Sequence, residues 1–171
     1  MKTEVGGLWK VRTKLEKYHE DIAPFKGREH VFHERYTPYE VVEQVGNSLL
    51  NEGINNMWSL ICGDAGADAY NNANARLGVG DSDAEVEATQ TDLQAASNKV
   101  YGAMESGYPI YGTNQKAVFK ASFNTDTANF TWNEWSVDNG SSAALNINRK
   151  VKALGTKASG TWTLTVEISL S

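Results

Sequence analysis

The chain has a single cysteine, Cys62, so one copy contains neither a disulfide nor a thiolate zinc site. It also lacks any apolar run close to the roughly 18 residues that a helix needs to cross a bilayer. The N-terminal sequence MKTEVGGLWKVRTKLEKY has no apolar stretch and no small-residue cleavage site, unlike a secretory signal peptide. We therefore expect a soluble protein that is made in the cytoplasm and has no membrane partner.

Basic residues are too few for nucleic acid to be the main partner. The net charge is −5, whereas phosphate binding needs a concentrated basic surface. The charge is uneven, because residues 1–36 carry +2, residues 37–98 carry −9 and residues 99–171 carry +2. This pattern fits head-to-tail contact between copies, in which the basic part of one copy meets the acidic part of the next. The alternative, which charge alone favours, is that these segments are ordinary solvated faces.

Sequence signatures of catalysis are missing as well. The chain contains no G-x-S-x-G, no S-x-x-K and no cysteine with catalytic partners. The segment LGVGDS lacks the lysine and the spacing of a phosphate-binding loop, and it indicates a strand end followed by a turn. His30 and His33 flank Val31 and Phe32, which favour an extended segment whose two imidazoles point to opposite faces. We expect no enzymatic activity, no cofactor and no metal at these histidines.

The acidic run Asp81, Asp83 and Glu85 is the weak candidate for a calcium site. Its spacing matches positions 1, 3 and 5 of an EF-hand loop. The pattern then departs from that loop, because Val86 occupies the position that requires glycine and Asp92 the position that has glutamate. The alternative is a capped turn whose acidic side chains face water.

Glu134 lies between Trp132 and Trp135 in the segment NFTWNEW. A carboxylate among aromatic side chains can serve as a catalytic acid, but glycoside hydrolysis needs a second carboxylate, and the sequence identifies none. We favour a structural role, with Glu134 buried and bonded to backbone amides or to Arg149 or Lys150. The tryptophans can also stack on sugars, although at strand spacing they are typical of a core.

The first 39 residues differ from the rest of the chain. Their apolar residues are scattered among charges, and Pro24 and Gly27 interrupt them, so they predict an extended N-terminal arm that cannot build a core alone. Removal of residues 2–36 should then leave the remaining domain folded. Aromatic side chains of such an arm are typical anchors in the pockets of a partner. The predicted interface residues are Trp9, Tyr18, Phe25, Phe32, Tyr36 and Tyr39.

Residues 40–63 predict a helical segment packed on the body of the protein. Val42, Val45 and Leu49 follow helical spacing, and the stripe continues after a polar interval. Gly53 either permits close packing or separates two shorter helices, and we favour the separation. Gly63 follows the last apolar residues, where a helix C-terminal cap is expected.

Residues 64–171 predict an antiparallel β domain, either a sandwich or a barrel. The clearest strand is the last, in which Trp162, Leu164, Val166 and Ile168 alternate with polar residues. Further strands are separated by Gly, Asn, Asp and Ser turns, with no helix between them. The segment DAEVEATQTDLQAA is either a short helix or a loop laid across the sheet. The predicted core contains Trp132, Glu134, Trp135, Trp162, Leu164, Val166 and Ile168.

The order of segments from Leu49 to Ser171 resembles a group of virion proteins from tailed bacteriophages. It is more distantly similar to the N-terminal modules of tail-collar fibres, and the resemblance covers about two thirds of the chain. Its firmest pieces are residues 78–81, 90–93 and 129–135, none of which is a catalytic motif. The chain departs from the fibre pattern because it has no shaft or receptor-binding tip and adds residues 1–39.

The resemblance implies a structural protein of the virion. The favoured function is a capsid decoration or cement protein that attaches through its N-terminal arm. A tail adaptor or tail-fibre-base protein is the alternative, and a carbohydrate-binding module is a further one. The implied partners are other copies of the chain and major capsid or tail proteins, with host-surface glycans as a further candidate.

The period-two pattern of the last strand predicts opposite effects at two adjacent positions. Val166→Asp should bury an unpaired charge and unfold the domain, since its cost of several kcal/mol is large beside a total stability of about 5–15 kcal/mol. Thr165→Asp, on the other face, should be tolerated. Thermal unfolding of both variants checks this, and equal behaviour of the two would mean that the strand assignment is wrong.

Overall fold

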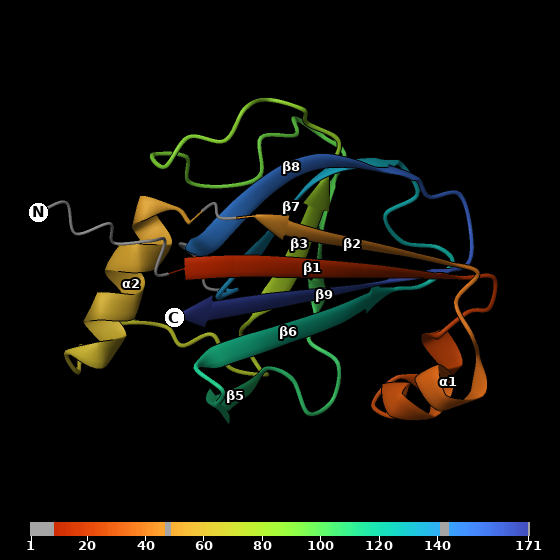
Figure 1. Ribbon diagram of the computed structural model, residues 1–171, viewed down its shortest axis with the longest axis horizontal. Coiled ribbons are helices and arrows are strands. Elements are labelled where there is room, and N and C mark those ends of the chain that lie inside the picture. Colours follow the sequence, from red (N-terminus) through yellow and green to blue (C-terminus); the bar gives the residue numbers. More distant parts are fainter. Residues whose placement is uncertain (1–8, 47–48, 141–143, 171) are drawn as a thin grey trace, which may run out of the picture.

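The computed structural model describes residues 9–46, 49–140 and 144–170. It shows two antiparallel sheets packed face to face (Figure 1). The five-stranded sheet has the order β2-β1-β9-β6-β5, and the four-stranded sheet has the order β4-β3-β7-β8. The predicted antiparallel β fold is therefore confirmed as a sandwich, and its sheets do not close into a barrel.

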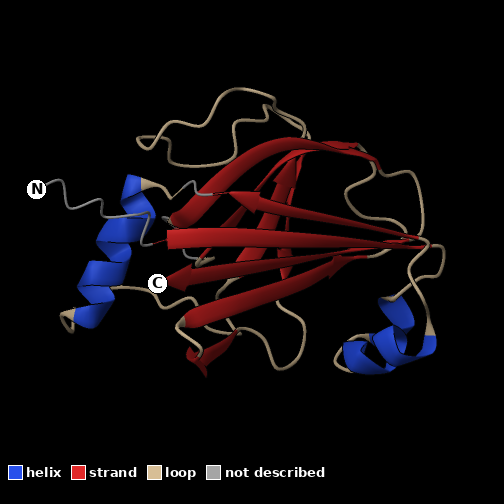
Figure 2. Ribbon diagram, in the orientation of Figure 1, coloured by secondary structure: helices blue, strands red, loops and turns tan. Residues whose placement is uncertain are grey.

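Strands make up more of the described chain than helices do, and the helices lie at the two ends of the sandwich (Figure 2). The five-stranded sheet consists of β1 (Trp9–Tyr18), β2 (Glu40–Gly46), β5 (Ile110–Thr113), β6 (Lys116–Phe123) and β9 (Thr161–Leu170). The four-stranded sheet consists of β3 (Arg76–Gly80), β4 (Lys99–Ala103), β7 (Thr131–Asp138) and β8 (Asn146–Thr156). The helices are η1 (Ala23–Phe25), α1 (Glu29–Arg35) and α2 (Asn51–Ile61). Among the described residues, no helix has the length and apolar character needed to cross a membrane.

β1 lies inside the five-stranded sheet, where the sequence predicted an extended arm. It pairs with β2 on one side and, along its whole length, with β9 on the other. Val11 and Leu15 are buried in the core, whereas Lys10 and Arg12 are exposed. The outward charges masked the period-two pattern of a strand. Residues 9–18 are therefore a strand and not an arm, and removal of residues 2–36 would take a central strand out of the sheet; residues 1–8 lie outside the described part.

Residues 40–63 contain a strand and a helix, not the helical segment that was predicted. β2 occupies the first part because Val41, Val42 and Val45 suit an edge strand that pairs with β1. Only α2 is helical. Gly53 lies within α2, and a Cβ atom there would collide with the backbone of Ile147 on β8. This glycine permits close packing of helix on sheet and does not separate two helices.

The core lies between the two sheets and is rich in aromatic side chains. Trp132 contacts Phe123 and Trp162 edge to face, with ring centroids 4.9 Å apart in both pairs. Such contacts add stabilisation beyond the apolar area that they bury. All seven residues predicted to form the core are buried, but only six of them belong to it, because Glu134 is buried on the outer face of the four-stranded sheet. Val166 is fully buried and Thr165 only partly, as the alternation in β9 requires.

The segment between β3 and β4 (loop 81–98) lies across the outer face of the four-stranded sheet. It contains no helix, so of the two structures that the sequence allowed, a short helix or a loop across the sheet, the loop is the one present. Two glycines of β3 make room for it. A Cβ atom at Gly78 would lie 2.9 Å from Leu93 of the loop and would also collide with Tyr101 on β4. One at Gly80 would lie 3.1 Å from the Cβ of Ala95 in the loop and would collide with Glu134. The G-x-G pattern therefore serves close packing of chain on sheet.

Candidate functional site

The six aromatic residues predicted as interface anchors separate into two groups. Four of them, with Ile22, form a second small core at the α1 end of the sandwich, where Phe32 is fully buried. These four are Tyr18, Phe25, Phe32 and Tyr36. They anchor α1 and η1 to their own chain, where Tyr18 and Phe32 are buried and Phe25 and Tyr36 stay partly exposed. Tyr39 is half exposed and stacks on His19, and Trp9 lies at the opposite end of the sandwich.

A buried polar network joins α1 to the five-stranded sheet. His33 Nε2 lies 2.9 Å from Glu105 Oε1, and its Nδ1 shares a hydrogen bond with the Tyr18 hydroxyl. Ser122 Oγ donates to the same Glu105 oxygen at 2.5 Å. Burial opposes ionisation of Glu105, but the hydrogen bond from His33 and the nearby Lys120 hold its pKa below the usual range. His33 lies on a helix, not on the extended segment that was predicted, and it fixes that helix in place.

Glu134 takes a structural position on the outer face of the four-stranded sheet. It is fully buried, and its Oε2 accepts a hydrogen bond from Arg149 Nε at 2.6 Å. Its two oxygens also accept from the backbone amides of Gln94 and Ala95. Arg149 in turn donates to the carbonyl oxygen of Ala84, so the ion pair ties both halves of loop 81–98 to the sheet. Glu134 has no free oxygen directed at a cavity.

The acidic run does not form a metal centre in the structure. Asp81 Oδ2 accepts from Asn98 Nδ2 at 2.7 Å, and Asp83 and Glu85 are exposed along the loop. Asp92 binds Lys99 and Tyr101 instead. Among the described residues, no three His, Cys, Asp or Glu side chains converge on a point that suits a metal ion.

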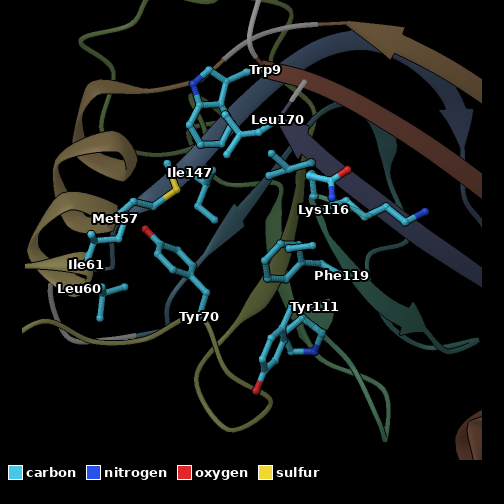
Figure 3. A pocket seen from close by; sticks show the side chains of 14 residues that line it. Trp9, Met57, Leu60, Ile61, Tyr70, Tyr111, Lys116, Phe119, Ile147 and Leu170 are labelled. Carbon is cyan, nitrogen blue, oxygen red and sulfur yellow. The ribbon is translucent and has the colours of Figure 1, made fainter. Parts of the chain in front are cut away.

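An apolar groove of about 410 Å³ lies beside α2 (Figure 3). We call it the α2 groove. Its lining residues come from α2 and the loop that follows it, from the β5–β6 hairpin and the residue before it, from the start of β8 and from the ends of β1 and β9. They are Trp9, Met57, Leu60, Ile61, Tyr70, Pro109, Tyr111, Gln115, Lys116, Ala117, Phe119, Ile147, Ile168 and Leu170.

The sandwich itself places the walls of the α2 groove. Trp9 and Leu170 are cross-strand neighbours at the ends of β1 and β9, so strand pairing brings the two ends of the described chain to one wall. Met57 and Ile61 lie four residues apart, which puts them on one face of α2. The hydroxyl of Tyr70 donates a hydrogen bond to the carbonyl oxygen of Leu145 at 2.9 Å, and burial raises the pKa of this tyrosine above its usual range. The polar end of Tyr70 is thus satisfied, and its ring remains an apolar wall.

Large apolar side chains are exposed along the rim of the α2 groove. Ile61 is 73% exposed and Tyr111 is 72% exposed, while Trp58, next to the lining on α2, is 61% exposed. Among the described residues that line the groove, Lys116 is the only Lys, Arg, Asp or Glu, and it forms an ion pair with Glu167 at 2.7 Å. This chemistry suits the binding of apolar side chains and offers no acid–base pair. The sequence patterns did not reveal this site, although the apolar residues of α2 (Ile54, Met57, Trp58, Leu60 and Ile61) are more than one buried face requires.

Glu134→Gln should lower the stability of the protein. Because we expect no enzymatic activity, the variant should abolish no turnover. The variant leaves the buried Arg149 without its carboxylate, which should cost about 3–5 kcal/mol of unfolding free energy. Glu87→Gln, an exposed change on the same loop, should alter stability by less than about 0.5 kcal/mol. Chemical denaturation of both variants checks this. Turnover of a glycan or peptide by the wild type that Glu134→Gln abolishes at unchanged stability would instead make Glu134 catalytic.

Comparison of the chain with family models, with curated proteins and with solved structures found no match. The resemblance of residues 49–171 to tailed-phage virion proteins therefore stays a prediction. The structure adds the place of the candidate residues: Glu134 and His33 have hydrogen-bond partners within the fold, and Asp83 and Glu85 are exposed. Ile61, Tyr111 and Leu170 are exposed at the α2 groove, whereas Tyr39, Val41 and Val45 are exposed elsewhere.

Proposed function

We propose that this chain is a non-enzymatic structural component of a tailed-phage particle, a capsid decoration or cement protein, and that it contacts neighbouring virion subunits through the α2 groove. The α2 groove is the observation that carries the proposal. A contiguous apolar surface of this kind is costly to leave in water and marks a site of protein interaction. The phage setting rests on the resemblance of the segments from Leu49 onward.

The contact surface differs from the one that the sequence predicted. Residues 9–18 cannot serve as an attachment arm, because they form a central strand of the sheet. Stacking of sugars on Trp132 or Trp135 is not available either, because both side chains are fully buried. The α2 groove and its rim supply the exposed aromatic and aliphatic side chains that both of those hypotheses required.

The body of the protein is suited to a structural role. Its buried carboxylates are paired, since Glu134 binds Arg149 and Asp138 binds Arg76. Burial raises the pKa of Asp138, and two hydrogen bonds from Arg76 oppose that rise. Removing one partner of such a pair is strongly destabilising, so these pairs favour a single rigid arrangement of the loops around the sandwich.

A single substitution on the rim should separate particle binding from folding. Ile61→Glu places a charge in the contact surface and should abolish binding to particles that lack the native protein. Because Ile61 is 73% exposed, the melting temperature should stay unchanged. Val41→Glu is the matched control, since Val41 is 46% exposed on β2 and does not line the α2 groove. Co-sedimentation with particles measures the binding.

Two results would overturn the proposal. One is that the wild-type chain neither binds such particles nor occurs in purified virions. The other is that Ile61→Glu binds as well as Val41→Glu does, which would place the contact elsewhere. Electron microscopy of decorated particles separates a head location from a tail adaptor or fibre-base location.

A further inference from the structure

We infer that the occupant of the α2 groove is a second copy of the same chain, whose Trp58 enters the groove while its own groove receives the first copy's Trp58. This inference rests on the proposed function and names the subunit at the α2 groove as a second copy of the chain. It makes the assembling unit an isologous dimer, in which the same patch of both copies forms the contact. The particle then binds the dimer, and Ile61→Glu loses particle binding because it cannot form that dimer.

The projecting side chain and the groove lie side by side on one helix. Successive residues of an α-helix are about 100° apart, so Trp58 lies roughly 60° around the axis from Ile61, which lines the α2 groove. Trp58 itself does not line it and is 61% exposed. Because Trp58 projects beside the α2 groove, a two-fold rotation can bring the Trp58 of each copy to the groove of the other. A large aromatic side chain in a hollow is also the usual anchor of a protein interface.

The charges at this end of the molecule permit two copies to meet. Glu52 is the only ionisable residue of α2, and it accepts hydrogen bonds from the backbone and side-chain nitrogens of Asn146. Lys116, in the lining, is already paired with Glu167. Closing the contact therefore buries no unpaired charge among these residues, although the chain as a whole carries −5.

The exposed apolar area is close to what a stable dimer needs. A buried aromatic side chain covers about 150–250 Å², and each partner in a standard interface contributes about 800 Å². Besides Trp58, Ile61 and Tyr111, Leu170 of the groove lining is 44% exposed. These four side chains can supply a large part of the contribution of one copy.

A complementation experiment tests this arrangement. Trp58→Ala removes the projection and keeps the groove, whereas Ala117→Trp fills the groove and keeps the projection. Each variant alone should be monomeric, with dimer affinity reduced about 30-fold or more. An equimolar mixture should recover dimers, because one projection still meets one open groove. Sedimentation equilibrium measures the mass against 18.7 kDa for one copy, and thermal unfolding shows that each variant is folded.

Ile61→Glu is a second groove-side variant, and its exposed position keeps folding intact if Ala117→Trp does not fold. The wild-type dimer should persist at high salt, because apolar contacts do not weaken with ionic strength as exposed ion pairs do. A wild-type chain that stays monomeric, or dimers that Trp58→Ala leaves unaffected, would contradict the inference. A monomeric chain that still binds particles through the α2 groove would leave the proposed function standing alone. Dimers that behave as expected but never bind particles would support the dimer inference and contradict the proposed function.

Discussion

The pairing of β1 with β9 is the interaction on which the rest of this structure depends. It joins residues 9–18 to residues 161–170 in continuous register inside the five-stranded sheet. At one end of the pair, Trp9 lies opposite Leu170, and both line the α2 groove. At the other end Tyr18 lies opposite Thr161, whose hydroxyl accepts a hydrogen bond from the amide of Ile22 and so helps to hold the second small core. One strand pair therefore positions both ends of the sandwich.

Buried polar groups add rigidity to this frame. Glu134 and Arg149 hold loop 81–98 on the four-stranded sheet, and Glu105 and His33 hold α1 on the five-stranded sheet. Each group is costly to bury unless its partner is present, so these contacts select one arrangement of the loops. The ionisable residues that were candidates for catalysis or metal binding, such as Glu134 and His33, thus have structural positions. The surface left for a partner is the apolar end of the molecule, which is why the proposed function is one of assembly.

Sequence patterns predicted the elements whose two faces differ in polarity. β9 was identified because Trp162, Leu164 and Val166 alternate with polar residues, and Gly63 marked the end of α2 with a positive φ of 81°. β1 was missed because a central strand that turns lysines and arginine to solvent resembles a charged arm. The α2 groove could not be predicted, since its walls come from segments far apart in the chain that only the completed sheet brings together. The close contact of Gly53 with Ile147 is likewise a tertiary effect that composition does not reveal.

Hydrogen exchange of the backbone amides in the native protein tests the central claim most directly. Amides in the interior of a sheet open only with large-scale unfolding, whereas those of an extended arm exchange almost without protection. The account predicts that residues 10–17 are protected to the same degree as residues 162–169, because the two strands can open only together. Rapid exchange of residues 10–17 beside a protected β9 would contradict it, and would restore the N-terminal segment as an arm that reaches for a partner.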